Sequence, residues 1–299
     1  MMDDVISGTR DDTNDGLGQD FETLRPLLFA IAYRMLGSAG DAEDVVQETY
    51  LRYQAADPHS IRSMKAYLTT VVTRLSIDQL KSARHQRESY VGAWLPEPLL
   101  TTPGDQPADL AALNDSLSNA LLVVLETLSP VERSVFLLHD VFDYDYAAIA
   151  EIVGKSEAAC RQALHRARGA VRSGRPRFHS TPDEHRLVFT RFLEACAEGD
   201  VEGLEAVLAA DVTAISDGGG KASAATRPLH GPKVVAALML GLFKRAPEGL
   251  EYELAEINGR TGLIVRQDGT AVVSFTADVA DGKITAVWAM RNPDKLSRL

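Results

Sequence analysis

A glycine between two helical patterns is the feature that most restricts how this chain can fold. Apolar residues recur at helical spacing in the short segment before Gly154, and again in the longer segment after it. The second segment has one apolar stripe: Cys160, Leu164, Ala167 and Val171. Glycine is favoured in the left-handed turn that ends a helix, and Ser156 is a good cap for the helix that follows. The pattern therefore predicts a helix-turn-helix over residues 146–172.

The second of these helices has a basic and polar outer face. The stretch Lys155–Arg177 holds seven Lys or Arg residues and one acid, although the whole chain has a net charge of −11. A compact basic block in an acidic protein is expected where nucleic acid is bound, whereas a helical hairpin with a solvated basic face is the alternative. Arg and Gln near the start of such a helix can contact bases, and later arginines can hold phosphates. The turn and the polar face together favour DNA binding.

Patterning divides the 299 residues into an all-α part and an α+β part. Helical spacing runs from about Phe21 to Arg87, with Asp41 as the expected cap of a helix that ends near Tyr53. It returns at Leu110, after a segment whose four prolines indicate a linker. Strand patterns dominate the end of the chain, where three dipeptides are typical of hairpin turns: Asn258-Gly259, Asp268-Gly269 and Asp281-Gly282.

These patterns predict five segments. They are a mobile acidic tail (1–19), a helical domain (20–89), a proline-rich linker (90–109), a helix-turn-helix domain (110–178) and an α+β domain (179–299). The longest apolar run has ten residues, whereas a membrane-spanning helix needs about 20, and no leader peptide opens the sequence. Two cysteines 36 positions apart exclude a disulfide scaffold and a cysteine-based zinc site. We therefore expect a cytoplasmic protein without a membrane anchor, cofactor or metal ion.

Three long strings of the sequence resemble a known family. In chain order they are AYRMLGSAGDAEDVVQETYLRY, YLTTVVTRLSIDQLKSAR and LSPVERSVFLLHDVFDYDYAAIAEIVGKSEAACRQALHRAR. Their order and spacing resemble the extracytoplasmic-function (ECF) sigma factors of bacterial RNA polymerase. Three short strings, WLPEP (94–98), DGGGK (217–221) and NPDKL (292–296), resemble markers of the subgroup with a SnoaL-like C-terminal domain. The resemblance implies a multidomain fold with two all-α sigma domains, the second a helix-turn-helix, followed by an α+β NTF2/SnoaL-like cone domain.

The resemblance also implies where partners bind, with residues 20–89 as sigma region 2 and 110–178 as sigma region 4. Contacts with core RNA polymerase are expected at Asp44, Gln47, Glu48 and Arg52. Contacts with the −10 promoter element, where the duplex must open, are expected at Ser60, Arg62, Lys65, Tyr67, Arg74 and Arg84. Contacts with the −35 element are expected at Ser156, Glu157, Ala158, Arg161, Gln162, His165, Arg166 and Arg168. Ala163 departs from the family pattern, which commonly has a basic residue at that position.

Two functions are open for the C-terminal domain. As an enzyme or ligand-binding module, its conical fold would offer a cavity in which an aspartate acts as acid or base. Candidate residues of such a cavity are Asp217, Lys221, Arg266, Trp288 and Arg291. As a regulatory module, it would pack on the sigma domains or on their linker, where large apolar side chains need a partner surface. Regulatory contacts are expected at Trp94, Leu95, Pro96, Asp217, Gly218, Gly219, Gly220, Lys221, Asn292, Pro293, Asp294, Lys295 and Leu296.

We favour regulation, so the chain is predicted to be a sigma factor and not an enzyme. It would bind core RNA polymerase and direct promoter-specific transcription initiation, with the C-terminal domain modulating that activity in cis. The expected partners are bacterial core RNA polymerase and promoter DNA, to which an anti-sigma protein or a small ligand of the C-terminal domain can be added. A stand-alone transcription regulator is a further interpretation. The polar face around Asp44 argues against it, because such a regulator does not need that surface.

Overall fold

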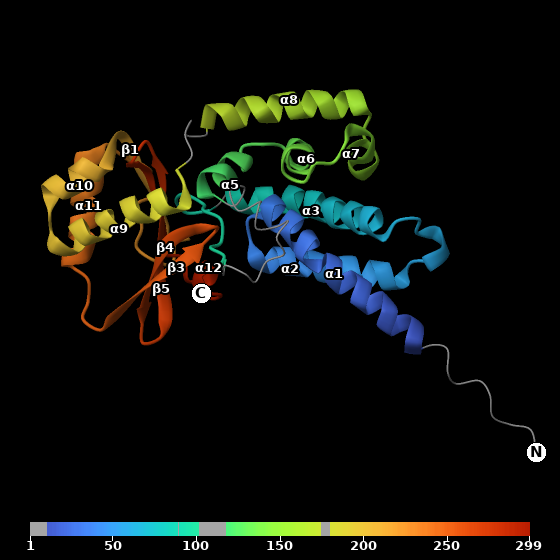
Figure 1. The fold of residues 1–299 in the computed structure, drawn as a ribbon, viewed down its shortest axis with the longest axis horizontal. Helices are drawn as coiled ribbons and strands as arrows, with labels where there is room; N and C mark the ends of the chain where they lie inside the picture. Colours follow the sequence, from blue (N-terminus) through green and yellow to red (C-terminus); the bar gives the residue numbers. More distant parts are fainter. Residues whose placement is uncertain (1–10, 89, 102–117, 175–179) are drawn as a thin grey trace, which may run out of the picture.

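The computed structural model describes the backbone of residues 11–88, 90–101, 118–174 and 180–299, and the side chains of 21–82, 90–101, 118–173 and 180–299. Figure 1 shows helical elements at one end and a sheet with its own helices at the other. The first helical group consists of α1 (Asp11–Leu36), α2 (Ala39–Ala55), the 3₁₀ turn η1 (Pro58–Ser60) and α3 (Met64–Glu88). Linker residues 90–101 leave this group in a largely extended conformation.

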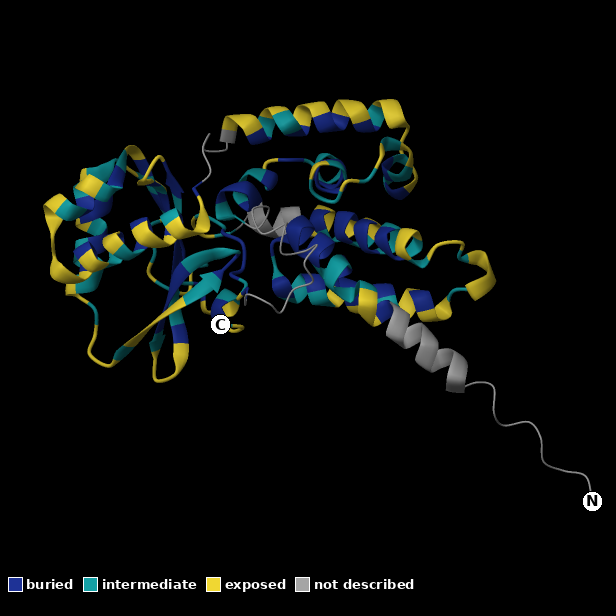
Figure 2. Ribbon diagram, in the orientation of Figure 1, coloured by how far each residue is buried: buried dark blue, intermediate teal, exposed yellow. Residues whose placement is uncertain are grey.

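The second helical group contains the predicted helix-turn-helix. Its elements are α5 (Asn119–Leu125), α6 (Pro130–Phe136), the π-helical turn η3 (Leu137–Val141), α7 (Tyr146–Val153) and α8 (Glu157–Gly174). Gly154 follows α7 with φ +65°, the left-handed conformation that glycine adopts without a Cβ penalty. Ser156 caps α8 through the backbone N–H of Ala159. The apolar stripe of α8 is buried, and Figure 2 shows its opposite side exposed.

The two helical groups share one hydrophobic core. Leu28 and Leu68 from the first group and Leu122, Leu138 and Leu164 from the second are buried in a single cluster. α3 lies in contact with both α6 and α7. Burial of aliphatic side chains at about 25 cal/mol per Å² makes this shared core a main source of cohesion. The helical part of the chain is therefore one packed body in this conformation.

The C-terminal part is a curved mixed sheet with helices on one face. Its described strands form a six-stranded sheet in the order β2-β1-β6-β5-β4-β3, in which β1 is parallel to β6 and the other pairs are antiparallel. The strands are β1 (Leu208–Asp217), β2 (Leu229–His230), β3 (Leu250–Ile257), β4 (Arg260–Gln267), β5 (Thr270–Ala280) and β6 (Lys283–Met290). The helices are α9 (Pro182–Glu198), α10 (Val201–Val207), α11 (Pro232–Lys244) and α12 (Pro293–Leu296).

The two faces of this sheet are covered by different parts of the chain. α9, α10 and α11 pack on one face, around Phe189, Phe192 and Met239. The other face packs against the linker and α5, where Leu95 and Ala120 meet Trp288. The predicted hairpin turns are present, since Asn258, Asp268 and Asp281 have φ near +50° and each is followed by a glycine with positive φ. The sheet thus joins its own domain to the two helical groups.

One local expectation is wrong. Ser38, and not Asp41, caps α2, because its hydroxyl accepts a hydrogen bond from the Asp41 backbone N–H and the helix begins at Ala39. The backbone of residues 11–19, which the sequence analysis placed in the acidic tail, forms the first turns of α1. Some residues lie outside the described part of the chain: 1–10 in the predicted tail, 89 at the end of the first helical domain, 102–117 across the linker and the start of the helix-turn-helix domain, and 175–179 at the next domain boundary. Among the described residues, no helix combines the length and apolarity needed to cross a membrane.

Candidate functional site

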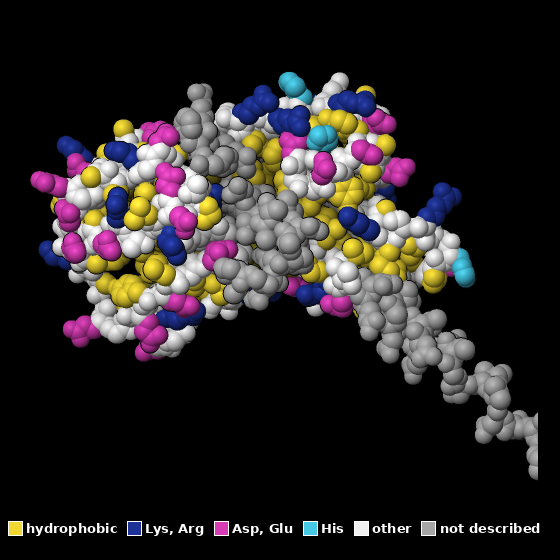
Figure 3. Space-filling model, in the orientation of Figure 1, with side chains coloured by type: hydrophobic (Ala, Val, Ile, Leu, Met, Phe, Trp, Pro, Cys, Tyr) yellow, Lys and Arg dark blue, Asp and Glu magenta, His cyan; other side chains and the backbone are white. Residues whose placement is uncertain are grey.

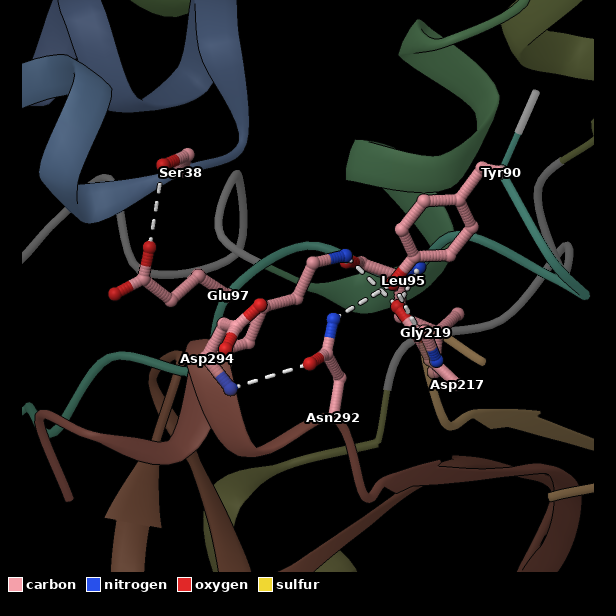
Figure 4. A network of polar contacts seen from close by, with 9 residues as sticks. Ser38, Tyr90, Leu95, Glu97, Asp217, Gly219, Asn292 and Asp294 are labelled. Atoms are coloured by element: carbon pink, nitrogen blue, oxygen red, sulfur yellow. Dashed lines mark hydrogen bonds and ion pairs between the residues drawn. The ribbon is translucent and has the colours of Figure 1, made fainter. Parts of the chain in front are cut away.

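The three short motifs of the sequence converge on one buried carboxylate, Asp217 (Figure 4). Asp217 ends β1 and has no exposed surface. Its Oδ1 accepts hydrogen bonds from the Tyr90 hydroxyl at 2.6 Å and from the Gly219 backbone N–H at 3.0 Å. Its Oδ2 accepts from the Leu95 backbone N–H at 2.9 Å and from Lys295 Nζ at 2.8 Å. The linker, the DGGGK loop and the C-terminal NPDKL segment are therefore held by the two oxygens of one side chain.

Lys295 supplies the charge that makes burial of Asp217 tolerable. Its ammonium also donates to the Leu95 carbonyl at 2.5 Å and lies 4.1 Å from the ring of Trp94 and 5.0 Å from the ring of Tyr90. A cation over aromatic faces is stabilised by the ring quadrupoles. Burial and the hydrogen bond to Asp217 raise the pKa of Tyr90, so its hydroxyl keeps its proton as a donor. Both ends of the ion pair thus contact the linker.

The rest of the DGGGK and NPDKL motifs shapes the same contact. A Cβ on Gly219 would clash with the Asn292 side chain, and one on Gly218 would clash with the Ala222 carbonyl oxygen. Asn292 Nδ2 donates to the Tyr90 hydroxyl at 2.9 Å, and Asn292 Oδ1 caps α12 by accepting from the Asp294 backbone N–H. The remaining residues have distinct places: Pro293 begins α12, Leu296 is buried beside Leu95, Gly220 lies near Val91, and Lys221 pairs with Asp294 at the surface.

The other half of WLPEP contacts the first helical group. Glu97 is 6% exposed, and its Oε2 accepts from the Ala39 backbone N–H at 2.7 Å and from the Ser38 hydroxyl at 3.2 Å. Its backbone N–H donates to the Gly37 carbonyl, and its carbonyl accepts from the Tyr33 hydroxyl at 2.6 Å. A carboxylate at the start of α2 interacts favourably with the helix dipole. Glu97, Tyr33 and Tyr90 were not among the residues predicted from the sequence, although Glu97 lies within the WLPEP motif.

Trp94 and Pro96 complete the linker contact. A Cβ on Gly37 would lie 2.6 Å from Trp94 Cη2, so the indole packs directly on the α1–α2 turn. Pro96 is buried and, together with Leu95, lines a small pocket against the sheet. The linker is therefore fixed on one side to the first helical group and on the other to the C-terminal domain.

The residues expected to contact polymerase lie on the outer face of α2. Asp44, Gln47 and Arg52 are exposed, and Glu48 is half-buried and pairs with Arg52 at 2.8 Å. Leu51, which sequence reasoning did not select, is 58% exposed on the same helix. An apolar side chain of this size amid polar residues adds contact area to a binding face.

Most residues expected at the −10 element lie close to η1 and the start of α3, but Arg74 lies against α7. Ser60, Arg62 and Lys65 are exposed around η1 and the start of α3, and the half-buried Tyr67 ring lies 6.4 Å from that of Tyr53. Arg74 instead donates to the carbonyls of Glu151 and Ile152, at 2.8 and 2.9 Å, and so caps the C-terminal end of α7. The side chain of Arg84 lies outside the described residues.

The residues expected at the −35 element lie along the outside of α8, where Figure 3 shows Lys, Arg and His side chains along the top of the molecule. Ser156, Glu157, Ala158, Gln162 and His165 are exposed. Three arginines of this face are ion-paired within the chain: Arg161 with Glu157, Arg166 with Glu132 and Arg168 with Asp140. Burial raises the pKa of Asp140, but hydrogen bonds from Arg168 and His139 outweigh it and hold that pKa below its ordinary value. Any DNA phosphate must therefore compete with internal carboxylates for these arginines.

The C-terminal domain also has an open cavity of about 930 Å³ on the helical side of its sheet. Figure 3 shows hydrophobic side chains gathered on the lower part of this domain. The cavity is lined by Thr190, Leu193, Glu194, Cys196, Ala197, Glu198, Gly199, Leu240, Phe243, Lys244, Tyr252, Leu254 and Leu263. The five residues suggested for an enzyme cavity are elsewhere, which corrects that assignment. Asp217 and Trp288 face the linker side, Lys221 pairs with Asp294 at the surface, Arg266 pairs with Glu253, and Arg291 donates to the Ser223 carbonyl.

Asp278 is a partly buried carboxyl that the sequence analysis did not select. It accepts a hydrogen bond from Trp288 Nε1 at 2.8 Å. Burial raises its pKa to about 6, against opposing effects of Trp288 and of the charge on Arg260. The pKa of an aspartate in the unfolded chain is about 4. Between about pH 4 and pH 6 the folded protein therefore keeps a proton on Asp278 that the unfolded chain has lost.

We predict that this carboxyl makes the domain less stable as pH rises from about 4 to 6, with no further loss above that range. Asp278→Asn keeps the acceptor for Trp288 and removes the charge, so it should raise stability at pH 7.5 by on the order of 2 kcal/mol and have little effect at pH 4. The measurement is the thermal midpoint of the full chain at both pH values. Asp281→Asn, in an exposed turn, is the control, and an equal effect of both variants would contradict the prediction.

Comparisons with known proteins agree with this architecture. The model of Sigma-70 region 2 matches residues 21–86, that of Sigma-70 region 4 matches 118–171, and that of the SnoaL-like domain matches 189–292. The chain is 42% identical over 290 residues to the ECF RNA polymerase sigma factor SigJ of Mycobacterium tuberculosis, covering 93% of this chain and 92% of that protein. The chain belongs to the ECF sigma factors of RNA polymerase.

The crystal structure of SigJ covers 93% of this sigma factor with a TM-score of 0.76 and 38% identity. A probable ECF sigma factor, SigI, from the same organism is 38% identical over 65% of this chain and 68% of its own length.

In this sigma factor, regions 2 and 4 pack directly on each other. Besides the cap that Arg74 provides for α7, the hydroxyls of Thr69 and Tyr144 are hydrogen-bonded at 3.0 Å, and Arg34 lies 5.7 Å from the ring of Phe142. One residue expected to contact DNA is thus used to hold the helix-turn-helix against region 2. Sequence could not reveal this contact, because Arg74 and α7 are separated by more than 70 positions.

Proposed function

We propose that this protein binds core RNA polymerase through α2, recognises a −10 element with region 2 and a −35 element with α8, and is held in a compact inactive form by its SnoaL-like domain. The observation that carries the proposal is the buried Asp217 network, in which the SnoaL-like domain holds the linker between regions 2 and 4. The five predicted segments are retained as its domain division.

The packing of regions 2 and 4 supports the idea that this form is inactive on promoters. The −10 and −35 elements lie about 25 base pairs apart, or about 85 Å of duplex at about 3.4 Å per base pair. α3 and α7 are in direct contact here, and Arg74 is engaged with α7 carbonyls. Both elements can be bound at once only if region 4 leaves region 2. A linker held by the SnoaL-like domain opposes that separation.

The acidic surface of the protein is compatible with this role. With a net charge of −11, the free chain as a whole is repelled by DNA phosphates. Three arginines of the α8 face are paired with internal carboxylates. Promoter binding is therefore expected to depend on assembly with polymerase, which holds both regions close to DNA.

The decisive experiment compares the full chain with a 1–178 truncation in run-off transcription from a genomic promoter library, using bacterial core polymerase. The truncation keeps the entire helical core, which contains only residues between Phe21 and Val171. We expect specific transcripts from both forms, with several-fold more from the truncation at limiting polymerase. Equal activity would contradict regulation in cis. An absence of transcripts with polymerase that is active with another sigma factor would contradict the sigma function.

A small ligand of the SnoaL-like domain is a second candidate, favoured by the cavity of about 930 Å³. Its lining is mainly apolar, and its size is within the range of about 300–1,000 Å³ that is typical of small-molecule sites. Such a ligand would act as an effector of the sigma domains. An anti-sigma protein remains a further proposed partner.

A further inference from the structure

We propose that the Asn258–Gly259 turn between β3 and β4 is a latch that fixes the SnoaL-like domain to the linker and to both sigma regions at once. This inference rests on the proposed regulation in cis and adds a second point of control to it. Asn258 and Gly259 belong to none of the three sequence motifs, WLPEP, DGGGK and NPDKL. Through one side chain, that of Asn258, the latch contacts residues of both region 2 and region 4.

The backbone of the turn extends the sheet onto the linker. The Asn258 N–H donates to the Leu99 carbonyl at 2.8 Å, and the Thr101 N–H donates to the Glu256 carbonyl at 2.9 Å. Leu100 forms an antiparallel bridge with Ile257. The linker therefore pairs with the end of β3 as a short strand, in the way that a peptide adds to an exposed sheet edge.

The side chain of Asn258 connects this pairing to the sigma regions. It is 2% exposed. Its Oδ1 accepts from the Leu99 N–H at 2.8 Å and lies 3.5 Å from the hydroxyl oxygen of Tyr33 in region 2, whose proton is donated to the Glu97 carbonyl at 2.6 Å. Its Nδ2 donates to Asn119 Oδ1 of region 4 at 3.1 Å, and Asn119 Nδ2 in turn donates to Thr276 Oγ1 of β5 at 2.8 Å. An amide is suited to this place because it accepts and donates without bringing a charge into a buried site.

The other hairpin turns of the domain show that these contacts are not needed to make a turn. Asp268 and Asp281 have the same left-handed backbone as Asn258, with φ near +50°, and both are exposed. Only the backbone conformation is required at those turns, whereas Asn258 combines the conformation with buried side-chain contacts. Since a buried amide that loses its partners is costly, the latch is all-or-none: the turn is either seated against the linker and both regions, or free of them.

Asn258→Gly tests the latch in the full chain, because glycine keeps the left-handed turn and removes the amide. Asp268→Gly is the matched control, with the same backbone change in an exposed turn. We expect Asn258→Gly to accelerate amide exchange at Leu99 and along α7 at least tenfold, and to raise run-off transcription at limiting core polymerase at least threefold. The control should leave both unchanged. Asn119→Ala, which removes the region 4 partner, should change both readouts in the same direction.

Asp217→Asn, measured in parallel, separates failure of the latch from failure of the proposed function. If Asp217→Asn raises transcription and Asn258→Gly and Asn119→Ala both match the Asp268→Gly control, the latch is wrong and regulation in cis stands. If Asp217→Asn and the 1–178 truncation also leave transcription unchanged, regulation in cis is wrong. The latch would also be wrong if Asn258→Gly had the same thermal midpoint as Asp268→Gly but gave less transcription than it.

Discussion

Asp217→Asn is expected to release the linker from the SnoaL-like domain. The variant keeps the shape of the side chain but removes the charge that is paired with Lys295 and replaces one acceptor oxygen by a donor. Loss of a charge-assisted hydrogen bond and a second acceptor in a buried site costs about 2–3 kcal/mol. At about 1.4 kcal/mol per tenfold change, amide exchange at Leu95 should become about a hundredfold faster. Promoter transcription at limiting polymerase should rise with it.

Asp294→Asn is the matched control for this experiment. Asp294 is the neighbour of Lys295 in the NPDKL motif, but it pairs with Lys221 at the surface. The side chains of Asp294 and Lys221 are 61% and 57% exposed. Exposed ion pairs contribute about 0–1 kcal/mol, so exchange at Leu95 should change less than about fivefold. Similar effects of the two variants would mean that the buried carboxylate is not what holds the linker.

Gly37→Ala is expected to detach the linker from region 2. Gly37 has φ +68°, so alanine there costs about 1–2 kcal/mol from the left-handed backbone alone. The added Cβ would also lie 2.6 Å from Trp94 Cη2, and the indole has to move off the α1–α2 turn. Chymotrypsin cleavage after Trp94 measures this movement, and we expect it to be at least tenfold faster than in the parent chain.

Gly199→Ala separates the backbone cost from the loss of the Trp94 contact. Gly199 ends α9 with φ +74°, and nothing lies within 4 Å of a Cβ at that position. It should lower the thermal midpoint of the protein through backbone strain and leave cleavage after Trp94 unchanged. Trypsin is a second control, because residues 89–129 contain no Lys or Arg. Equal chymotrypsin sensitivity of the two alanine variants would contradict a role for Gly37 in seating the linker.

Features that depend on neighbouring residues could be predicted from the sequence. Gly154 between two helical patterns gave the helix-turn-helix, and the pairs that begin at Asn258, Asp268 and Asp281 gave the hairpin turns. In each case the physical cause is local, since a left-handed backbone favours glycine, asparagine or aspartate whatever surrounds it. The polar outer faces of α2 and α8 were predictable for a related reason, because helical periodicity places residues on one side of a helix.

The partners of these residues could not be predicted in the same way. Alternation along β5 and β6 places Asp278 and Trp288 on one face of the sheet, but it does not say whether a cavity or the linker covers that face. Trp288, which was suggested for an enzyme cavity, therefore lies on the face of the sheet that is opposite the cavity. The linker covers that face, and the cavity opens on the other.

The sequence by itself determined the order of the domains, the helix-turn-helix, the hairpin turns and the three motifs that meet at the interface. The tertiary structure decided that Asp217 binds Tyr90, Leu95 and Lys295, that Glu97 caps α2, and that Arg74 caps α7. These contacts join positions far apart in the chain. Local preferences act over a few residues, whereas burial of a charge selects its partner only after the domains have packed.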